Sequence, residues 1–277
     1  MDEKAFSSID FVSQCLQDEE KFKGFNSVLK RVVKPGDAVL DVGTGSGILA
    51  LIAASRKPKS ICALEFDPYI ARSAQQNLDA NGYSDIAQVV TGDARTYRFN
   101  KGSKFNVVIM EMLTVGMIDE FQIQAINNLH KQGVVSKGTT FVPARQETFI
   151  TVAEVDFNLY KFTMKMVLHL WNYYHKIGRK ELSTKMLLSD IDFKKETNER
   201  FSKTIRIPIR VNGTINAIIL SSRAVVGTNI YLEDTKSLNP PVAIPLPDYQ
   251  VKRGQIVSLK IEYIFGHGFQ NFKATLL

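Results

Sequence analysis

The sequence predicts an α/β fold followed by an antiparallel β domain, and three observations carry this prediction. Between residues 35 and 145, short apolar runs alternate with helical patterns, which is typical of a parallel sheet covered by helices on both faces. After Pro143, long two-residue alternation replaces that pattern and indicates antiparallel strands. At 277 residues, the chain can bury a sufficient core in one large domain or in two modest ones.

Two amphipathic helices are expected before the sheet. Residues 5–16 place their apolar side chains on one helical face, and a second helical pattern runs from Phe25 to Val32. The turn Lys34-Pro35-Gly36 then leads into the first strand. We therefore divide the chain into N-terminal helices (1–34), a parallel-sheet domain (35–145) and a β-barrel-like domain (146–277).

The parallel-sheet domain is predicted from strict alternation of strand and helix. Short helices are expected at 48–55, after the N-cap Asp67 with Pro68 at the first helical position, and from Asp119 to Lys131. The predicted strands start with the run Ala38–Leu40 and continue with Ser60–Phe66, Ala87–Thr91, Phe105–Met110 and Thr139–Val142.

The second domain is predicted to be a β-barrel or sandwich. Alternating apolar and polar residues fill Thr204–Val211, Ile215–Leu220 and Gln255–Phe265, with glycine and proline between the runs. The segment 156–203 is rich in aromatic and charged residues, including Trp171, Tyr173 and Tyr174, and we interpret it as mixed in structure.

The stretch Val39–Gly47, which reads V-L-D-V-G-T-G-S-G, predicts a buried strand, a glycine turn and a helix N-terminus. Glycine permits backbone angles that a Cβ forbids and lets a ligand approach the main chain. No lysine follows the glycines, which excludes a phosphate-binding P-loop, and the dinucleotide fingerprint would put its third glycine at Ile48. The carboxylate of Asp41 would repel a pyrophosphate but suits an ammonium or sulfonium group. The predicted ligand-binding residues of this stretch are Asp41, Gly43, Thr44, Gly45 and Gly47.

Acidic residues also end the next three predicted strands, where ligands of open α/β sheets bind. Glu65 follows Gly43 by 22 residues and can accept hydrogen bonds from both ribose hydroxyls. Asp93 can accept from an adenine amine, with a backbone N–H at Ala94, and Glu111 ends the fourth strand. Because no phosphate-binding cation accompanies them, the pattern favours a nucleoside without pyrophosphate, and S-adenosylmethionine fits.

The chain at this point resembles the class I S-adenosylmethionine-dependent methyltransferases, with a Rossmann-like domain, and more narrowly the protein arginine methyltransferases. The resemblance covers most of residues 16–145. In the family motif L-x-D-x-x-R-x-x-x-[YF], an arginine meets the carboxylate of the cofactor. Here Leu16, Asp18 and Phe25 match, and Lys21 replaces the arginine, keeping the charge without the bidentate fork. The resemblance implies that the N-terminal helices close over the cofactor.

The same family carries two glutamates, with eight residues between them, that grip a guanidinium group. Glu111 and Glu120 have this spacing, so the resemblance implies that they are the catalytic pair. Two carboxylates can hold a planar cation by two-point bonds and aim its nitrogen at the methyl group. The segment Phe141–Arg145 is similar to the F-P-x-R exit of the family that leads to a β-barrel. N-methylation of a cationic acceptor such as protein arginine is therefore expected.

One feature of the arginine methyltransferases is absent from the sequence. Their Thr-His-Trp loop should fall near Lys236-Ser237-Leu238, where no histidine occurs, so Asp18 lacks its family partner. Two alternatives to arginine methylation therefore stay open. The first is an RNA or other nucleic-acid methyltransferase, since Lys and Arg outnumber Asp and Glu by 18 to 12 in residues 146–277. The second is a weakly active or inactive binding module that keeps the fold.

The nucleic-acid alternative lacks one expected motif, because the fourth strand ends in M-E-M-L and not in [ND]-P-P-[YF], which base-methylating enzymes use. The four histidines show no ligand spacing, so no metal site is predicted, and Cys15 and Cys62 are expected to be buried thiols. No signal peptide or membrane-spanning run is expected, which makes the cytoplasm the default location. A protein or peptide acceptor is the expected partner. The oligomeric state stays open, with a dimer as one alternative.

Overall fold

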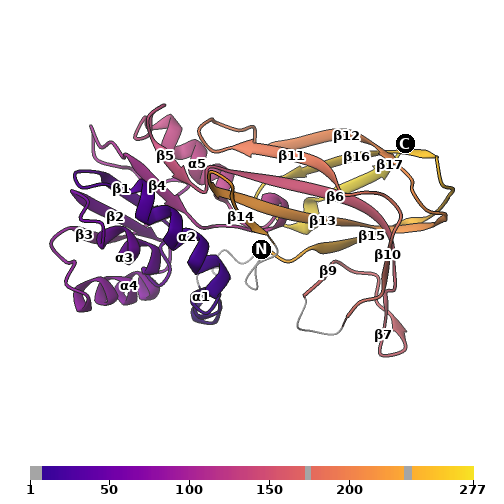
Figure 1. Ribbon diagram of the computed structural model, residues 1–277, viewed down its shortest axis with the longest axis horizontal. Helices are drawn as coiled ribbons and strands as arrows, with labels where there is room; N and C mark the ends of the chain where they lie inside the picture. The colour runs from indigo at the N-terminus through magenta and orange to yellow at the C-terminus, as the bar shows by residue number, and fades with distance from the viewer. Residues whose placement is uncertain (1–7, 172–175, 234–238) are drawn as a thin grey trace.

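The computed structural model of the chain describes residues 8–171, 176–233 and 239–277. Figure 1 shows two parts side by side along the long axis of the molecule, an α/β part and a part built of long strands. The N-terminal helix α1 (Ile9–Leu16) lies near the junction of the two parts (Figure 1).

The α/β part contains a five-stranded parallel sheet in the order β3-β2-β1-β4-β5. Strand β1 is central and pairs with β2 on one side and β4 on the other. The strand order therefore reverses beside β1, and a ligand is expected at the carboxyl end of this strand. The strands are β1 (Ala38–Val42), β2 (Ser60–Glu65), β3 (Ala87–Thr91), β4 (Val107–Met110) and β5 (Thr140–Val142).

The helices start where their capping residues predict. The carboxylate of Asp67 accepts hydrogen bonds from the backbone N–H groups of Tyr69 and Ile70, as expected of an N-cap residue. Asp18 caps α2 in the same way, through the N–H of Lys21. After α1 the helices are α2 (Glu19–Val32), α3 (Ile48–Ala54), α4 (Pro68–Ala80) and α5 (Gln122–Lys131).

The second part is built from antiparallel sheets. One sheet has the order β10-β6-β13-β15-β9, with β11 also paired to β6 and β14 to β13. A second sheet has the order β12-β16-β17, and β7 and β8 form a separate hairpin. The long strands are β6 (Arg145–Val155), β11 (Met186–Asp192), β12 (Arg200–Pro208), β13 (Gly213–Gly227), β15 (Val242–Val251) and β16 (Ile256–Ile264). The short ones are β7 (Asn158–Leu159), β8 (Phe162–Thr163), β9 (Leu168–His169), β10 (Arg179–Glu181), β14 (Ile230–Glu233) and β17 (Lys273–Leu276).

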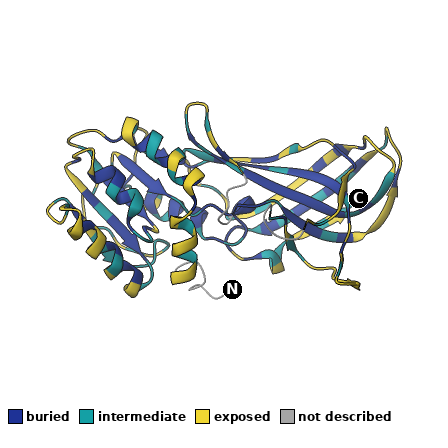
Figure 2. Cartoon of the chain, turned by 60° about the horizontal axis from the view of Figure 1, so that its bottom comes forward, coloured by how far each residue is buried: buried dark blue, intermediate teal, exposed yellow. Residues whose placement is uncertain are grey.

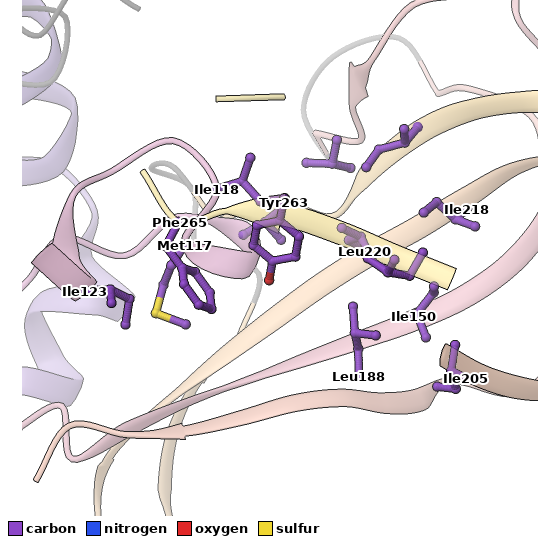
Figure 3. Close-up of a cluster of buried hydrophobic side chains, with 14 of the residues drawn as sticks. Met117, Ile118, Ile123, Ile150, Leu188, Ile205, Ile218, Leu220, Tyr263 and Phe265 are labelled. Carbon is purple, nitrogen blue, oxygen red and sulfur yellow. The ribbon is translucent and has the colours of Figure 1, made fainter. Parts of the chain in front are cut away.

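The two parts share a hydrophobic core. A single cluster of buried residues includes Leu40 and Val108 of the parallel sheet together with Ile150 and Leu220 of the antiparallel sheet. Figure 3 shows Ile150 and Leu220 of this cluster on the paired strands β6 and β13, and Tyr263 on β16 of the second sheet. Figure 2 shows the central strands of both parts as buried and the outer helix faces as exposed. The burial of these side chains makes the junction a packed interface.

The predicted fold class is confirmed: a Rossmann-like parallel sheet is followed by an antiparallel, barrel-like part. The helix expected from Asp119 starts only at Gln122, because a 3-10 turn, η2 (Val115–Met117), precedes it and Gly116 has a φ of +63°. In the described residues of 156–203, strands β7 to β11 replace the mixed structure that we expected. Tyr173 and Tyr174 lie outside the described residues.

Candidate active site

The glycine loop leaves β1 and forms one wall of a cavity. Gly43, Gly45 and Gly47 all have positive φ angles, of 69°, 53° and 81°, as expected of a turn that excludes a Cβ. Gly43, Thr44 and Gly45 line the cavity. Gly47 does not line it, because it is the N-cap of α3 and packs against Ala74 of α4.

Asp41 also lies outside the cavity lining, and its predicted contact with the ligand stays a prediction. Its side chain is buried beneath the glycine loop, and its Oδ2 accepts a hydrogen bond of 2.6 Å from the hydroxyl of Thr44. Burial raises the pKa of Asp41 to about 7, against the opposing effect of the Thr44 hydrogen bond. Asp41 therefore supports the loop through Thr44, and Thr44 is the one of the two that faces the cavity.

Glu65, at the end of β2, lines the cavity and is tied to the glycine loop. One carboxylate oxygen accepts a hydrogen bond of 2.9 Å from the N–H of Gly45, and the other accepts one of 3.1 Å from the N–H of Asp67. An ionised carboxylate has lone pairs beyond these two bonds, so Glu65 can still accept from hydroxyl groups.

Asp93 and Ala94 line the cavity beyond β3, together with Arg95. The guanidinium of Arg95 binds both carboxylate oxygens of Asp93, with its Nε 2.9 Å from each. Burial alone would raise the pKa of Asp93, but the hydrogen bonds and charge of Arg95 lower it. The Arg95 guanidinium also lies 4.2 Å from the centre of the Phe121 ring. Arg95 is not among the residues predicted from the sequence, although its place two residues after Asp93 is a signal for such a pair.

Lys21 and Glu111 come together at the opposite wall. The ammonium of Lys21 lies 3.1 Å from Oε2 of Glu111, and both side chains are largely buried. Burial disfavours both charges, and the charge of Glu111 holds the pKa of Lys21 above its usual value. Within the described part of the chain, the ammonium has no hydrogen-bond partner beyond this ion pair, so donors remain for a ligand.

Glu120 joins Glu111 in the lining of the same cavity. Its side chain is buried, and its Oε2 has no hydrogen-bond partner among the described residues. Burial, together with the charge of Glu111, raises the pKa of Glu120 well above its usual value. A buried carboxylate of this kind gains most from a cationic ligand, which would restore its charge.

Helix α1 covers the cavity. Only the family resemblance predicted this position of the helix. Phe11, Val12, Cys15 and Leu16 of this helix line the cavity, yet no residue of α1 is fully buried. Cys15 and Cys62 form no disulfide and are partly, not fully, buried. The stretch 236–238, where the family would place its Thr-His-Trp loop, lies outside the described residues.

The described residues contain neither a metal-binding cluster nor a membrane-spanning helix. Residues 8–171, 176–233 and 239–277 contain no group of three His, Cys, Asp or Glu side chains that could hold a metal ion. Among the helices of the same ranges, none is long and apolar enough to cross a membrane.

The residues that line the cavity fit S-adenosylmethionine in their chemistry. The glycines leave space that side chains would fill, and Lys21 offers unused donors where a carboxylate could bind. Carboxylates at the ends of β2 and β3 can accept from hydroxyl and amine groups. Among the described residues, the cations of the lining are Lys21 and Arg95, and each is paired with a carboxylate.

Comparison with known proteins places this chain among methyltransferases. The model of the ribosomal protein L11 methyltransferase (PrmA) family matches residues 24–154. The uncharacterized protein MJ1452 of Methanocaldococcus jannaschii is 31% identical over 261 residues, which cover 94% of each chain. The ribosomal protein L11 methyltransferase of Bacillus subtilis is 52% identical over 61 residues, which are 22% of this chain and 20% of that protein.

The fold also matches a solved structure, the PRMT1 enzyme-prozyme heterotetrameric complex of Trypanosoma brucei with AdoHcy. The TM-score is 0.76 at 12% identity, and the match covers 99% of this chain and 98% of the other. This likeness concerns the fold, including the antiparallel part that the PrmA model does not cover. The full-length relative shows that the chain belongs to one family with the M. jannaschii protein. With the matches to ribosomal protein L11 methyltransferases, the chain is a class I S-adenosylmethionine-dependent methyltransferase that resembles protein methyltransferases.

Proposed function

We propose that this enzyme methylates a cationic nitrogen of a protein or peptide, such as the guanidinium of arginine. The observation that carries the proposal is that two glutamates, the largely buried Glu111 and the buried Glu120, line the same cavity as the glycine loop. A cation placed between them would lie beside the cofactor-binding residues. The proposed cofactor-binding residues that line the cavity are Lys21, Gly43, Thr44, Gly45, Glu65, Asp93 and Ala94.

The two glutamates would act differently because their surroundings differ. Glu111 is paired with Lys21, which fixes its carboxylate and leaves it ready to accept a further hydrogen bond. Glu120 has an unpartnered oxygen within the described part of the chain, and burial raises its pKa. An arriving cation would favour its ionised form, and Glu120 could then take up the proton that the acceptor nitrogen loses. S-adenosylmethionine, when bound, supplies an electrophilic methyl group on a sulfonium centre.

Each of the three parts of the chain would have its own role in this reaction. We propose that residues 1–34 cover the cofactor through α1 and the Lys21 side chain, and that residues 35–145 bind it. Residues 146–277 would form the wall against which the acceptor and its protein lie. The contacts of Phe11 and Val12 with the cavity support the first assignment.

A second candidate acceptor comes from the PrmA match. The relatives of that family are named for methylation of a ribosomal protein, and the match spans the glycine loop and both glutamates. An amine of a ribosomal protein is therefore the alternative to arginine. Like a guanidinium, an ammonium group would be attracted to Glu111 and Glu120.

Radiolabelled methyl transfer over several acceptors tests the proposal. The purified chain would be incubated with labelled S-adenosylmethionine and, in parallel, an arginine-rich peptide, a lysine-rich peptide, recombinant ribosomal protein L11 and bulk RNA. We expect label in a protein or peptide acceptor, and amino-acid analysis would identify the modified nitrogen. Label in RNA alone would contradict the proposal and favour the nucleic-acid alternative.

Calorimetric measurement of cofactor-product binding distinguishes an inactive protein from a wrongly chosen acceptor. We expect S-adenosylhomocysteine to bind. Binding without transfer to any acceptor would contradict the proposed activity and favour a binding module that keeps the fold.

A further inference from the structure

The loop between the two glutamates, residues 111–120, is held at its midpoint by side chains of the antiparallel part. We call this segment the glutamate loop. The N–H of Gly116 donates a hydrogen bond of 2.8 Å to Oγ of Ser222 on β13. The carbonyl of Gly116 accepts one of 3.2 Å from the hydroxyl of Tyr263 on β16. Both backbone polar groups of one residue are thus fixed by two strands of different sheets.

Three further hydrogen bonds from the antiparallel part fix the same loop. The side-chain amide of Gln146 donates to the carbonyl of Thr114 at 2.7 Å. The N–H groups of Gly266 and Gly268 donate to the carbonyls of Met117 and Ile118, at 3.0 Å and 2.8 Å. The second part of the molecule therefore fixes the backbone of the loop at four residues, Thr114 and 116–118.

The backbone conformation and the close packing at residue 116 both favour glycine. The φ of Gly116, +63°, is in the left-handed region, and a Cβ would lie 3.2 Å from two side-chain atoms of Ile118. Figure 3 shows Met117 and Ile118 of the loop beside Tyr263 and Phe265. Apolar packing and hydrogen bonds thus act on the same three residues.

The two hydroxyl groups lie where a hydrogen bond is strong. Ser222 and Tyr263 are 2% and 4% exposed, and water cannot replace a lost bond at such sites without rearrangement. Oγ of Ser222 also lies 3.1 Å from the hydroxyl of Thr148, which helps to orient it. Burial raises the pKa of Tyr263, so its phenol keeps the proton that it donates.

We propose that Ser222 and Tyr263 are positioning residues that set the placement of Glu111 and Glu120 through the backbone of Gly116. This inference rests on the proposed function, in which those glutamates hold the acceptor. A displacement of about 1 Å at a reacting group can lower a rate by about 100-fold. Loss of either hydroxyl therefore lowers turnover although neither residue touches the acceptor.

The test compares Tyr263→Phe and Ser222→Ala with the matched control Ser183→Ala. Tyr263→Phe removes the hydroxyl and keeps the ring, which packs against Phe201, Phe265 and Phe272. Ser183 is a buried serine whose Oγ accepts from the N–H of Val152, and it makes no hydrogen bond to the glutamate loop. The control therefore loses a similar bond at another site of the same part of the molecule.

Steady-state methylation of the arginine-rich peptide, or of the acceptor that takes the label, gives the first readout. We expect kcat to fall at least tenfold in Tyr263→Phe and Ser222→Ala, with the affinity for S-adenosylhomocysteine unchanged within twofold. Ser183→Ala should lose thermal stability as Ser222→Ala does but keep kcat within twofold. Ser222→Thr, which restores a hydroxyl, should recover part of kcat. Equal kcat values in Ser222→Ala, Tyr263→Phe and the control would overturn the inference.

Hydrogen exchange of peptides covering residues 111–120 gives a readout that needs no acceptor. We expect exchange at least tenfold faster in Ser222→Ala and Tyr263→Phe than in Ser183→Ala. Unchanged exchange in the loop would refute the positioning role whatever the activity. If the wild-type chain labels no acceptor while the loop exchanges faster in the two variants, the proposed function fails and the anchoring of the loop stands.

Discussion

The ammonium of Lys21 lies 3.1 Å from Oε2 of Glu111, and this ion pair joins helix α2 to the residue that follows β4. The exposed fractions of the two side chains are 5% and 16%, so neither charge is well solvated. Each residue therefore depends on the other for its charge, and each faces the cavity. In the proposed function, the ion pair would link the binding of the cofactor to the placement of the acceptor.

The first prediction concerns the acid of this pair. Glu111→Gln keeps the shape of the side chain but removes the charge, so methyl transfer should fall by at least about 100-fold, since the acceptor loses one charged partner. Affinity for S-adenosylhomocysteine, measured by calorimetry, should change by no more than a few fold. Unchanged turnover would remove Glu111 from the mechanism.

The same variant should be less stable by about 3 kcal/mol, because Lys21 is left buried without its partner. Denaturant unfolding would measure this. Removing both charges, in Lys21→Met with Glu111→Gln, should cost less than the sum of the two single changes. An additive result would show that the ion pair contributes no coupling energy.

The second prediction concerns the cofactor end of the pair. Lys21→Met should weaken binding of S-adenosylhomocysteine by about 10- to 100-fold, because a hydrogen bond between charged groups contributes about 1.5–3 kcal/mol. Calorimetry would measure the affinity. Lys23→Met is the matched control: Lys23 is on the same helix but its side chain is 71% exposed and pairs only with Glu19 among the described residues. Its loss should leave the affinity unchanged within twofold, and an equal effect of both variants would contradict the assignment.

The third prediction separates the role of Gly45 in cofactor binding from the effect of backbone strain on stability. Gly45→Val should abolish measurable cofactor binding, because the side chain would enter the cavity that Gly45 lines. Gly82→Val is the matched control. Gly82 also has a positive φ, of 78°, but nothing lies within 4 Å of a Cβ there. Both variants should lose about 1–2 kcal/mol of stability from the strained backbone, while only Gly45→Val loses binding. Retained affinity in Gly45→Val would contradict the predicted role of the loop.

Local sequence signals predicted the parallel sheet well, because each of its elements carries its own pattern. The cap Asp67-Pro68 and the strand Ala87–Thr91 are found where they were predicted. Strands of two or three residues, such as β7 to β10, are too short to show alternation, which explains why that region was read as mixed. Their pairing comes from tertiary contacts that no local pattern records.

The candidate site was predicted as a set of strand ends, but its internal contacts were not. The ion pair of Lys21 with Glu111 and the hydrogen bond of Gly116 to Ser222 connect residues that are far apart in the sequence. Asp41 is a different case: its place in the loop strand predicts a ligand contact, which stays a prediction, and the side chain turns beneath the loop and binds Thr44. The residue spacing was correct there, but the direction of the side chain depends on the packing around it.

The last prediction concerns pH and follows from the buried position of Asp41. The carboxyl group has an ordinary pKa of 3.8, and burial raises it to about 7 in the folded chain. Between these two values, the unfolded chain releases a proton that the folded chain keeps. The free energy of unfolding should therefore fall as the pH rises from about 4 to about 7, by at most about 4 kcal/mol from this group.

Asp41→Asn removes this contribution but keeps a side-chain oxygen that can accept from Thr44. Relative to the wild type, the variant should thus become steadily more stable across this range and level off above pH 7. Guanidinium unfolding at pH 4, 5.5, 7 and 8 would measure the difference, with the exposed Asp10→Asn as control. A constant difference between Asp41→Asn and the wild type at all four pH values would show that Asp41 titrates as it does in the unfolded chain.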